Sequence, residues 1–287
     1  MTAPTSLLSS VGQAAKDILA NSPEEASAAP ELASHVKNAQ GHARTWLDST
    51  SHSVEEPLHA IRSFTATYMD TTAAHLAELA ASVKAGGTDA QSAKAQLVQQ
   101  LQDAKAALAD LRSRLSRGHD AVNTLDRDLA ADVAAFNGDM TAISTKIASD
   151  EELQKQLGHD IGEQLAKLKA LQEALTHLNV LASGVDFGSL MSQSMQIAAE
   201  QCYLKALVKR LGVLVASVAA AEDALVAIGN ALSQTQGILD NVLDSVTRAT
   251  ATSAFLTARL NVIKNNVRDL GDQLDHLLGT TAEGARA

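Results

Sequence analysis

Residues 204–249 read LKALVKRLGVLVASVAAAEDALVAIGNALSQTQGILDNVLDSVTRA, and apolar side chains recur in this stretch at intervals of three and four. The repeating positions are Leu204, Leu207, Leu211, Leu214, Val218, Ala221, Leu225, Ile228, Leu232, a polar step at Thr235, Leu239, Val242, Val246 and Ala249. This spacing places them on one side of an α-helix, and a sustained seven-residue repeat is typical of helices that pack along their length. It predicts one helix over residues 189–248.

The same rhythm continues elsewhere in the chain. It predicts helices over residues 6–19, 31–83 and 254–278, with Gly86-Gly87 ending the second and Pro57 kinking it or marking a restart. The last of them carries Leu256, Leu260, Ile263, Val267, Leu270, Leu274 and Leu277. A further tract carries Leu97, Leu101, Ala104, Leu108, Leu111, Leu115, Val122, Leu125, Leu129, Val133, Phe136, Met140, Ile143 and Ile147, with a stutter between Leu129 and Val133.

These helices predict an all-α fold: an elongated antiparallel bundle of four to five long helices with a small head at one end. We expect residues 1–30 to form an amino-terminal helix and linker, and residues 31–179 and 203–278 to form the bundle. Residues 180–202 would form the head, since Gly184 and Gly188 bracket a reversal, and residues 279–287 a disordered tail. Near Ser149 the pattern is compatible with either a bend or a restart.

Composition limits the function. A formal net charge of −10 argues against binding to nucleic acid, which requires a basic face. The single cysteine, Cys202, excludes an intramolecular disulfide and is expected to pack as a small apolar residue. The longest uncharged apolar run, residues 211–221, is about half of the ~20 residues that cross a bilayer, so no membrane span is expected. The amino terminus shows no evident signal peptide.

Two segments carry a family resemblance. Ala43-Arg44-Thr45-Trp46-Leu47-Asp48 is followed by Ile61, Phe64 and Tyr68, and Leu125-Asp126-Arg127-Asp128-Leu129 leads to Phe136. They resemble the amino-terminal Trp-Leu-Asp segment and the central helix of the α-helical pore-forming toxins of the haemolysin BL, non-haemolytic enterotoxin and cytolysin A type. The helix order is also similar over most of the chain.

The resemblance implies a secreted protein that is soluble before it associates with a membrane. The implied partners are other toxin subunits of similar helical fold and the target-cell membrane, with homo-oligomers as a further form. The membrane-piercing members carry a long Gly/Ala-rich apolar hairpin, whereas residues 178–202 here, LNVLASGVDFGSLMSQSMQIAAEQC, are short and mixed in polarity. The chain is therefore most similar to a soluble component of a multi-component assembly, and pore formation by this chain alone is in doubt.

The apolar residues of the predicted head are the candidate contact surface for a membrane or a partner subunit. They are Leu181, Val185, Phe187, Leu190, Met191 and Met195. Burial of four of the larger side chains would gain on the order of 6 to 8 kcal/mol before ordering costs, which suits shallow insertion or docking. The alternative is that they cap the bundle core or pack against a symmetry partner.

Metal chemistry has one weak motif. Glu56 and His59 have the Glu-x-x-His spacing of carboxylate-bridged di-iron bundles, but no second such pair follows, so a surface Glu and His are expected. His35 and His42, like the pair His52 and His59, are seven residues apart, which is two helical turns and too far for shared ligation. The sequence predicts no metal ion and no cofactor.

Aromatic residues at helical spacing, Trp46, Phe64 and Tyr68, are expected to pack in the helix seams, with an aromatic site for lipid or sugar as the alternative. Phosphate loops, nucleophile elbows and zinc spacings are missing from the sequence, so catalysis is not predicted. The leading hypothesis is a soluble component of a multi-component α-helical pore-forming toxin. The alternative is a structural or scaffolding coiled-coil bundle protein.

Overall fold

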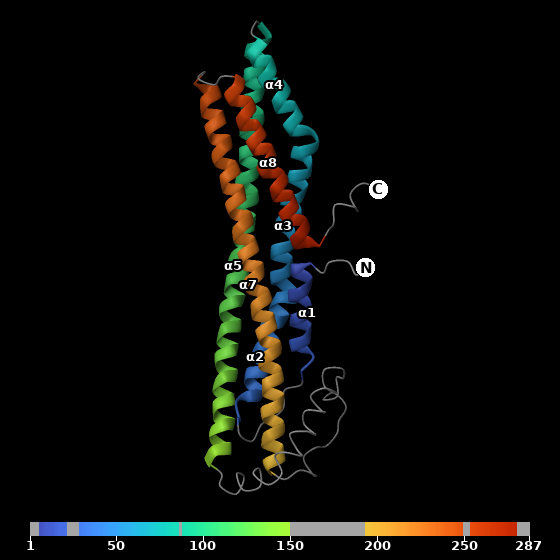
Figure 1. The fold of residues 1–287 in the computed structure, drawn as a ribbon, viewed down its shortest axis with the longest axis vertical. Helices are drawn as coiled ribbons and strands as arrows, with labels where there is room; N and C mark the ends of the chain where they lie inside the picture. Colours follow the sequence, from blue (N-terminus) through green and yellow to red (C-terminus); the bar gives the residue numbers. More distant parts are fainter. Residues whose placement is uncertain (1–5, 22–28, 86–87, 150–192, 249–252, 280–287) are drawn as a thin grey trace, which may run out of the picture. The chain divides into compact units, whose positions relative to one another are not determined.

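The computed structural model describes residues 6–21, 29–85, 88–149, 193–248 and 253–279, whose helices are drawn in Figure 1. Every regular element in these ranges is helical, which confirms the predicted all-α fold. The described elements begin with α1, which spans Leu7–Leu19. The longest are α5 (Thr88–Ser149), α7 (Gln193–Thr247) and α8 (Ser253–Leu278), whose bounds lie close to the predicted ones.

One continuous helical tract follows α1. It consists of α2 (Leu32–Thr45), α3 (Ser51–Thr67) and α4 (Ala73–Ala85). Two π-helical turns, η1 (Trp46–Thr50) and η2 (Tyr68–Thr72), join them. A π turn holds one residue more than an α turn, so each one rotates the buried face by one position relative to the helix before it.

The π turns are visible in the spacing of the buried residues. Burial steps by four through Trp46, Thr50 and Val54, with no buried residue three positions after either of the first two. Tyr68, the first residue of η2, is followed by the next buried position, Leu76, eight residues later. Both π turns begin at an aromatic side chain that is only 1% exposed. The insertion keeps one side of a long helix buried where a strict heptad would drift away from its neighbours. Pro57 lies inside α3 and is buried, so it does not restart the helix.

The predicted apolar stripes of α7 and α8 are confirmed. Every described member of the two series is buried: Leu204, Leu207, Leu211, Leu214, Val218, Ala221, Leu225, Ile228, Leu232, Leu239, Val242, Val246, Leu256, Leu260, Ile263, Val267, Leu270, Leu274 and Leu277. The polar step is buried as well, because the hydroxyl of Thr235 donates to the carbonyl of Ala231 at 2.9 Å and so is satisfied within its own helix.

The predicted stripe of α5 is wrong at two positions. Val133 and Met140 are half-buried, whereas Asp132 and Asp139 are 5% and 6% exposed. With the two aspartates included, the buried positions keep an unbroken alternation of three and four: Leu115, Gly118, Val122, Leu125, Leu129, Asp132, Phe136, Asp139 and Ile143. The predicted stutter is therefore absent, and the sequence reading failed because it excluded charged residues from the core.

The chain divides into two compact units, each described by itself. Unit 1 comprises Met1–Ser10, Ser49–Asn123 and Ala220–Ala287. In it α3, η2 and α4 all pack against α8, as Figure 1 also shows. An ion pair between Arg62 and Asp275, with nitrogen and oxygen 3.1 Å apart, links α3 to α8.

Unit 2 comprises Val11–Asp48 and Thr124–Ala219. The amide of Gln40 on α2 donates to the carbonyl of Asn21, just after α1, at 2.5 Å, and Arg210 of α7 donates to the side chain of the same asparagine. These bonds tie α1, α2 and α7 together. The predicted division with a head at residues 180–202 lies largely outside the described residues and stays a prediction.

One helix of the described part is long and apolar enough to cross a membrane by length and composition, namely Ala199–Thr247 within α7. The sequence reading expected none, because Glu222 and Asp223 interrupt the apolar run. Only 33% of the most apolar window of this helix is buried. A core helix of a soluble protein passes the same criterion, so the finding by itself is weak support for a membrane span.

Candidate functional site

The predicted contact surface at the head lies outside the described residues. This holds for Leu181, Val185, Phe187, Leu190 and Met191. Met195 falls within α7, but its side chain is not described. The membrane- or partner-contacting role of these six residues therefore stays a prediction.

Two histidine–aspartate pairs join α2 to α5 in unit 2. Nδ1 of His35 lies 2.8 Å from Oδ2 of Asp139, and Nδ1 of His42 lies 2.7 Å from Oδ2 of Asp132. Partner numbers rise along α2 as they fall along α5, so the two helices run antiparallel here. Both pairs are one heptad apart on each helix, which places all four side chains along one seam.

The two carboxylates occupy core positions of this seam. The side chains of Asp132 and Asp139 are 6% and 7% exposed, and those of His42 and His35 are 31% and 22% exposed. The ring of Phe136, which lies between the two aspartates along α5, meets the ring of His35 edge-on with centroids 6.5 Å apart. The acids are thus enclosed by apolar and aromatic surface, while the imidazoles reach solvent.

Burial governs the electrostatics of this seam. It raises the pKa of the Asp132 carboxyl, and the hydrogen bond and charge of His42 only partly oppose that shift. Asp128, one turn earlier on α5, raises the same pKa further by charge repulsion. A raised pKa in the fold means that the ionised carboxylate at neutral pH opposes folding, so the imidazole partner is needed to offset its burial.

Sequence reasoning missed these pairs. It noted that His35 and His42 are seven residues apart and too far apart to share a ligand, and in the structure each binds an aspartate of α5 instead. It did not connect them with Asp132 and Asp139, which are also seven apart. The matching period of two histidines and two acids was the available signal, although only the fold could identify the partner helix.

The aromatic residues divide between core and periphery. Trp46 and Tyr68 are buried as predicted, while Phe64 is half-buried, with its ring centroid 6.0 Å from that of Tyr68. Burial raises the pKa of Tyr68 to about 12. A Cβ atom added at Gly12 of α1 would lie 4.0 Å from Nε1 of Trp46, so the indole packs close to α1. Neither buried ring is available for an aromatic lipid or sugar site in this state.

The Glu56 and His59 motif forms no metal centre in the described residues. Glu56 accepts a hydrogen bond from Arg114 of α5 at 3.0 Å, and His59 is exposed. Across the described ranges, groups of three or more His, Cys, Asp or Glu side chains placed to hold a metal ion are absent. Cys202 is a half-buried free thiol on α7.

Pro57 explains a close helix contact in unit 1. Because proline has no N–H, the carbonyl of Ser53 cannot accept the usual helical bond from residue 57. Gly118 of α5 packs against that carbonyl so closely that an added Cβ would lie 2.8 Å from the Ser53 oxygen. The glycine is therefore required by the approach of α5 to α3.

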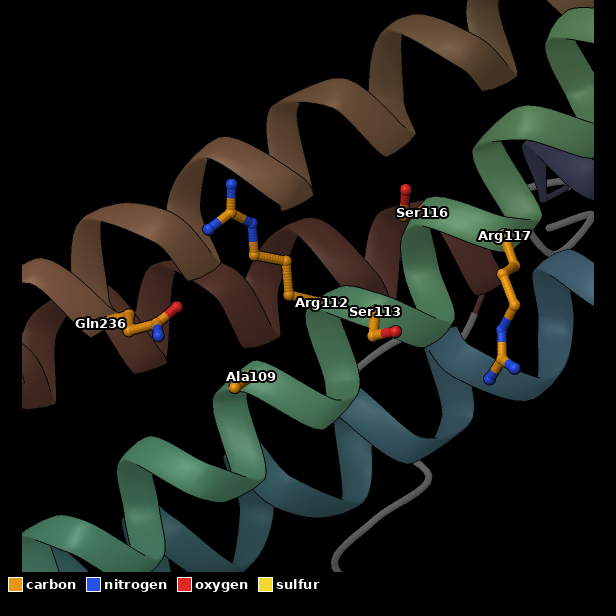
Figure 2. A pocket seen from close by; sticks show the side chains of 6 residues that line it. All are labelled: Ala109, Arg112, Ser113, Ser116, Arg117 and Gln236. Atoms are coloured by element: carbon orange, nitrogen blue, oxygen red, sulfur yellow. The ribbon is translucent and has the colours of Figure 1, made fainter.

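A shallow hollow of about 400 Å³ lies on unit 1 between α5 and α7 (Figure 2). It is lined by Ala109, Arg112, Ser113, Ser116, Arg117 and Gln236. Figure 2 shows the two arginine side chains extending in different directions. The lining holds neither a carboxylate nor a histidine that could activate a serine, so the hollow offers no catalytic machinery.

The outward face of α7 is apolar over residues 212–220 and again at Val226, with the exposed Asp223 between them. Val213 is 53% and Val226 45% exposed, two of the three large exposed hydrophobic residues in the described chain. Ala216, Ala219 and Ala220 are exposed between them. A helix that is apolar on its buried and on its outward side is typical of one that is covered in another state or assembly.

Comparison with known proteins places the chain among toxin components. The family model for the Bacillus haemolytic enterotoxin (HBL) matches residues 15–179, which is more than half of the chain. The match covers the end of α1, from residue 15, and all of α2 to α5, so it includes both histidine–aspartate pairs. None of the curated proteins matches in sequence.

Solved structures of tripartite toxin components have a similar fold. Soluble SmhB of the tripartite alpha-pore forming toxin Smh from Serratia marcescens aligns with a TM-score of 0.59 at 12% identity, over 96% of this chain and 89% of that one. The AhlB pore of the toxin AHL from Aeromonas hydrophila aligns with a TM-score of 0.54 at 15% identity, over 96% and 98%. The Bacillus cereus HblL1 toxin component aligns at 0.55 and 13%, over 95% of each.

Proposed function

This chain belongs to the Bacillus haemolytic enterotoxin (HBL) family, and from that membership we propose that it is a soluble component of a multi-component α-helical pore-forming toxin. In this proposal it is secreted, remains soluble until it meets the target membrane, and assembles there with partner subunits of similar helical fold. The observation that carries the proposal is the family match over residues 15–179. No enzymatic role is proposed.

The helix seams support a change of partners during assembly. Heptad positions filled with Leu, Val and Ala can exchange one helix for another with little loss of packing, because these apolar side chains need no specific hydrogen-bond partner. The fold is similar both to soluble SmhB and to the pore of AhlB. That similarity concerns the fold alone, but it makes a state-dependent arrangement of these helices a reasonable physical expectation.

The outward face of α7 supports contact with a lipid or protein surface. Val213 and Val226 leave apolar area in water that assembly would cover, at about 25 cal/mol gained per Å² buried. Glu222 and Asp223 lie within the same tract, and carboxylates are costly in a bilayer. Partner subunits are therefore the better-supported cover, and the chain is not expected to span a membrane alone.

A liposome-leakage assay tests the proposal. The purified chain alone should release little dye, and its addition to cognate partner proteins, encoded beside it or co-purified from the culture medium, should restore lysis of cells and vesicles. A matched set of partners that lyses equally well without the chain would refute the proposal. A scaffolding protein would show no effect on leakage and the same protease cleavage pattern with and without detergent.

A further inference from the structure

The pairs His35–Asp139 and His42–Asp132 do more than complete a helix seam. We propose that these four residues form a pH-responsive latch, the α2–α5 latch, which holds the two helices together most firmly in mildly acidic solution and less firmly above neutral pH. Opening of the latch would free α2, and with it the α2 face that the seam now covers. The inference concerns a regulated property of the isolated chain and goes beyond the toxin assignment.

Because the acids occupy buried positions, the stability of the seam depends on the hydrogen-bond donors that face them. In the register of α5, Asp132 and Asp139 stand one and two heptads after the buried Leu125, at buried heptad positions. An apolar residue at such a position would stabilise the seam at every pH, whereas a buried carboxylate needs a donor. The only side-chain donors that contact them in the described residues are the two imidazoles.

The charge of the imidazole decides the strength of each bond. Histidine ordinarily changes its charge between pH 5 and 8. When it is protonated, each pair joins opposite charges, so Coulomb attraction adds to the hydrogen bond that the carboxylate accepts. When it is neutral, a buried carboxylate accepts only a neutral N–H, and the penalty for its burial is less well offset. Seam stability should therefore fall as pH rises through the histidine titration.

Neighbouring charges act in the same direction. Glu31, one turn before His35, lies with its Oε2 3.6 Å from Nε2 of that ring, so a positive charge on the ring would have a second carboxylate beside it. The charged groups that act on the Asp132 carboxyl are His42, Asp128 and His35, of which Asp128 adds negative charge to the seam. On the neighbouring α7, Arg210 is engaged by the side chain of Asn21.

Protons can reach the latch from solvent. A hollow of about 380 Å³ lies beside the first pair and is lined in part by Glu31, His35, Gly138 and Asp139. The half-buried rings expose an edge to water while the acids stay enclosed. The latch can therefore respond to external pH without prior unfolding.

The chain contains its own reporter. Trp46 is its only tryptophan, is 1% exposed, and directly follows α2 in η1. Its fluorescence in urea titrations at pH 5.5, 6.5 and 8 gives an equilibrium constant for release of this end of α2. For two pairs, the expected constant is on the order of tenfold smaller at pH 5.5 than at pH 8, from the difference between charged and neutral hydrogen bonds.

Variants separate the latch from other titrating groups. The double variant His35→Gln/His42→Gln should reduce the tenfold ratio to less than about twofold, as should Asp132→Asn/Asp139→Asn. The matched control is His52→Gln/His59→Gln, which has the same spacing on α3, where both rings are exposed, and should keep the full ratio. Far-UV circular dichroism confirms that each variant is folded before its ratio is compared.

A measurement on the native protein also tests the latch, so the test does not depend on whether the variants fold. Hydrogen exchange of the backbone amides of residues 32–45, corrected for intrinsic rates, should be slower at pH 5.5 than at pH 8 relative to the amides of α8. Equal or reversed protection, or a full ratio in the His35/His42 variant, would refute the latch. Neither experiment contains membranes or partners, so their failure leaves the proposed toxin function untouched, and a negative lysis assay leaves the latch untouched.

Discussion

Gly118 should be the least replaceable glycine of α5. Its substitution by alanine places a methyl group 2.8 Å from the carbonyl oxygen of Ser53, whereas unstrained C···O contacts begin near 3.3 Å. The obstacle is backbone, so α3 and α5 must separate by about 0.5 Å over that turn. Overpacking of this kind costs about 1 to 3 kcal/mol, and the better helix propensity of alanine returns about 1 kcal/mol. The expected net loss of unfolding free energy is up to about 2 kcal/mol.

Gly138 supplies the matched control on the same helix. A Cβ at Gly138 meets nothing within 4 Å, so Gly138→Ala keeps the gain in propensity and should stabilise by up to about 1 kcal/mol. The difference between the two variants therefore isolates the close contact, at about 1 to 3 kcal/mol. Urea denaturation followed by circular dichroism at 222 nm measures both. If Gly118→Ala is as stable as Gly138→Ala, α3 and α5 do not approach each other as described.

Three further predictions concern the surface of α7, an ion pair and a buried phenol. Val213→Asp should leave the unfolding free energy within about 0.5 kcal/mol of wild type but should reduce lysis with partner proteins. The control Val262→Asp, at a 40% exposed valine of α8, should reduce neither stability nor lysis. Equal losses of lysis in the two variants would contradict a role for α7. Arg62→Ala, which removes the half-buried pair with Asp275, should cost at most about 1 kcal/mol at low salt and nothing measurable in 1 M NaCl. The pKa of Tyr68 is raised to about 12, so the stability it contributes is complete below pH 10 and is lost as pH rises toward 12. Between pH 9 and 11.5, wild type should lose about 2 kcal/mol more than Tyr68→Phe in urea titrations, and parallel losses would count against the burial of the phenol.

Most of the fold could be predicted because burial in a long helix follows a period. The apolar residues of α7 all follow the same helical spacing, so the buried stripe from Leu204 to Val246 could be predicted without knowing which helices pack against it. The family resemblance read from Trp46 and the segment around Leu125 is confirmed by the family match over residues 15–179. The first π turn was also readable in principle, since buried positions step by four from Trp46 through Thr50 to Val54.

The candidate site was less predictable, for a physical reason. A charged residue at a heptad position is predicted to be exposed unless its partner is known. The partners of Asp132 and Asp139 lie 90 and 104 residues away along the chain. Local pattern cannot supply a contact of that separation. Gly118 is a similar case, because its need for glycine arises from a carbonyl on α3 that Pro57 leaves exposed to it.

The two kinds of buried polar residue have different consequences for register. Thr235 satisfies its hydroxyl within α7, so it places no demand on a neighbouring helix. Asp132 and Asp139 are satisfied only across the seam, and only when α2 lies in one register. A slip of α2 by one heptad would still bring His42 opposite Asp139, but it would leave Asp132 opposite Ser49, without an imidazole. A buried carboxylate that loses its partner costs about 3 to 5 kcal/mol, so the doubled pair selects one register where leucines alone would tolerate several.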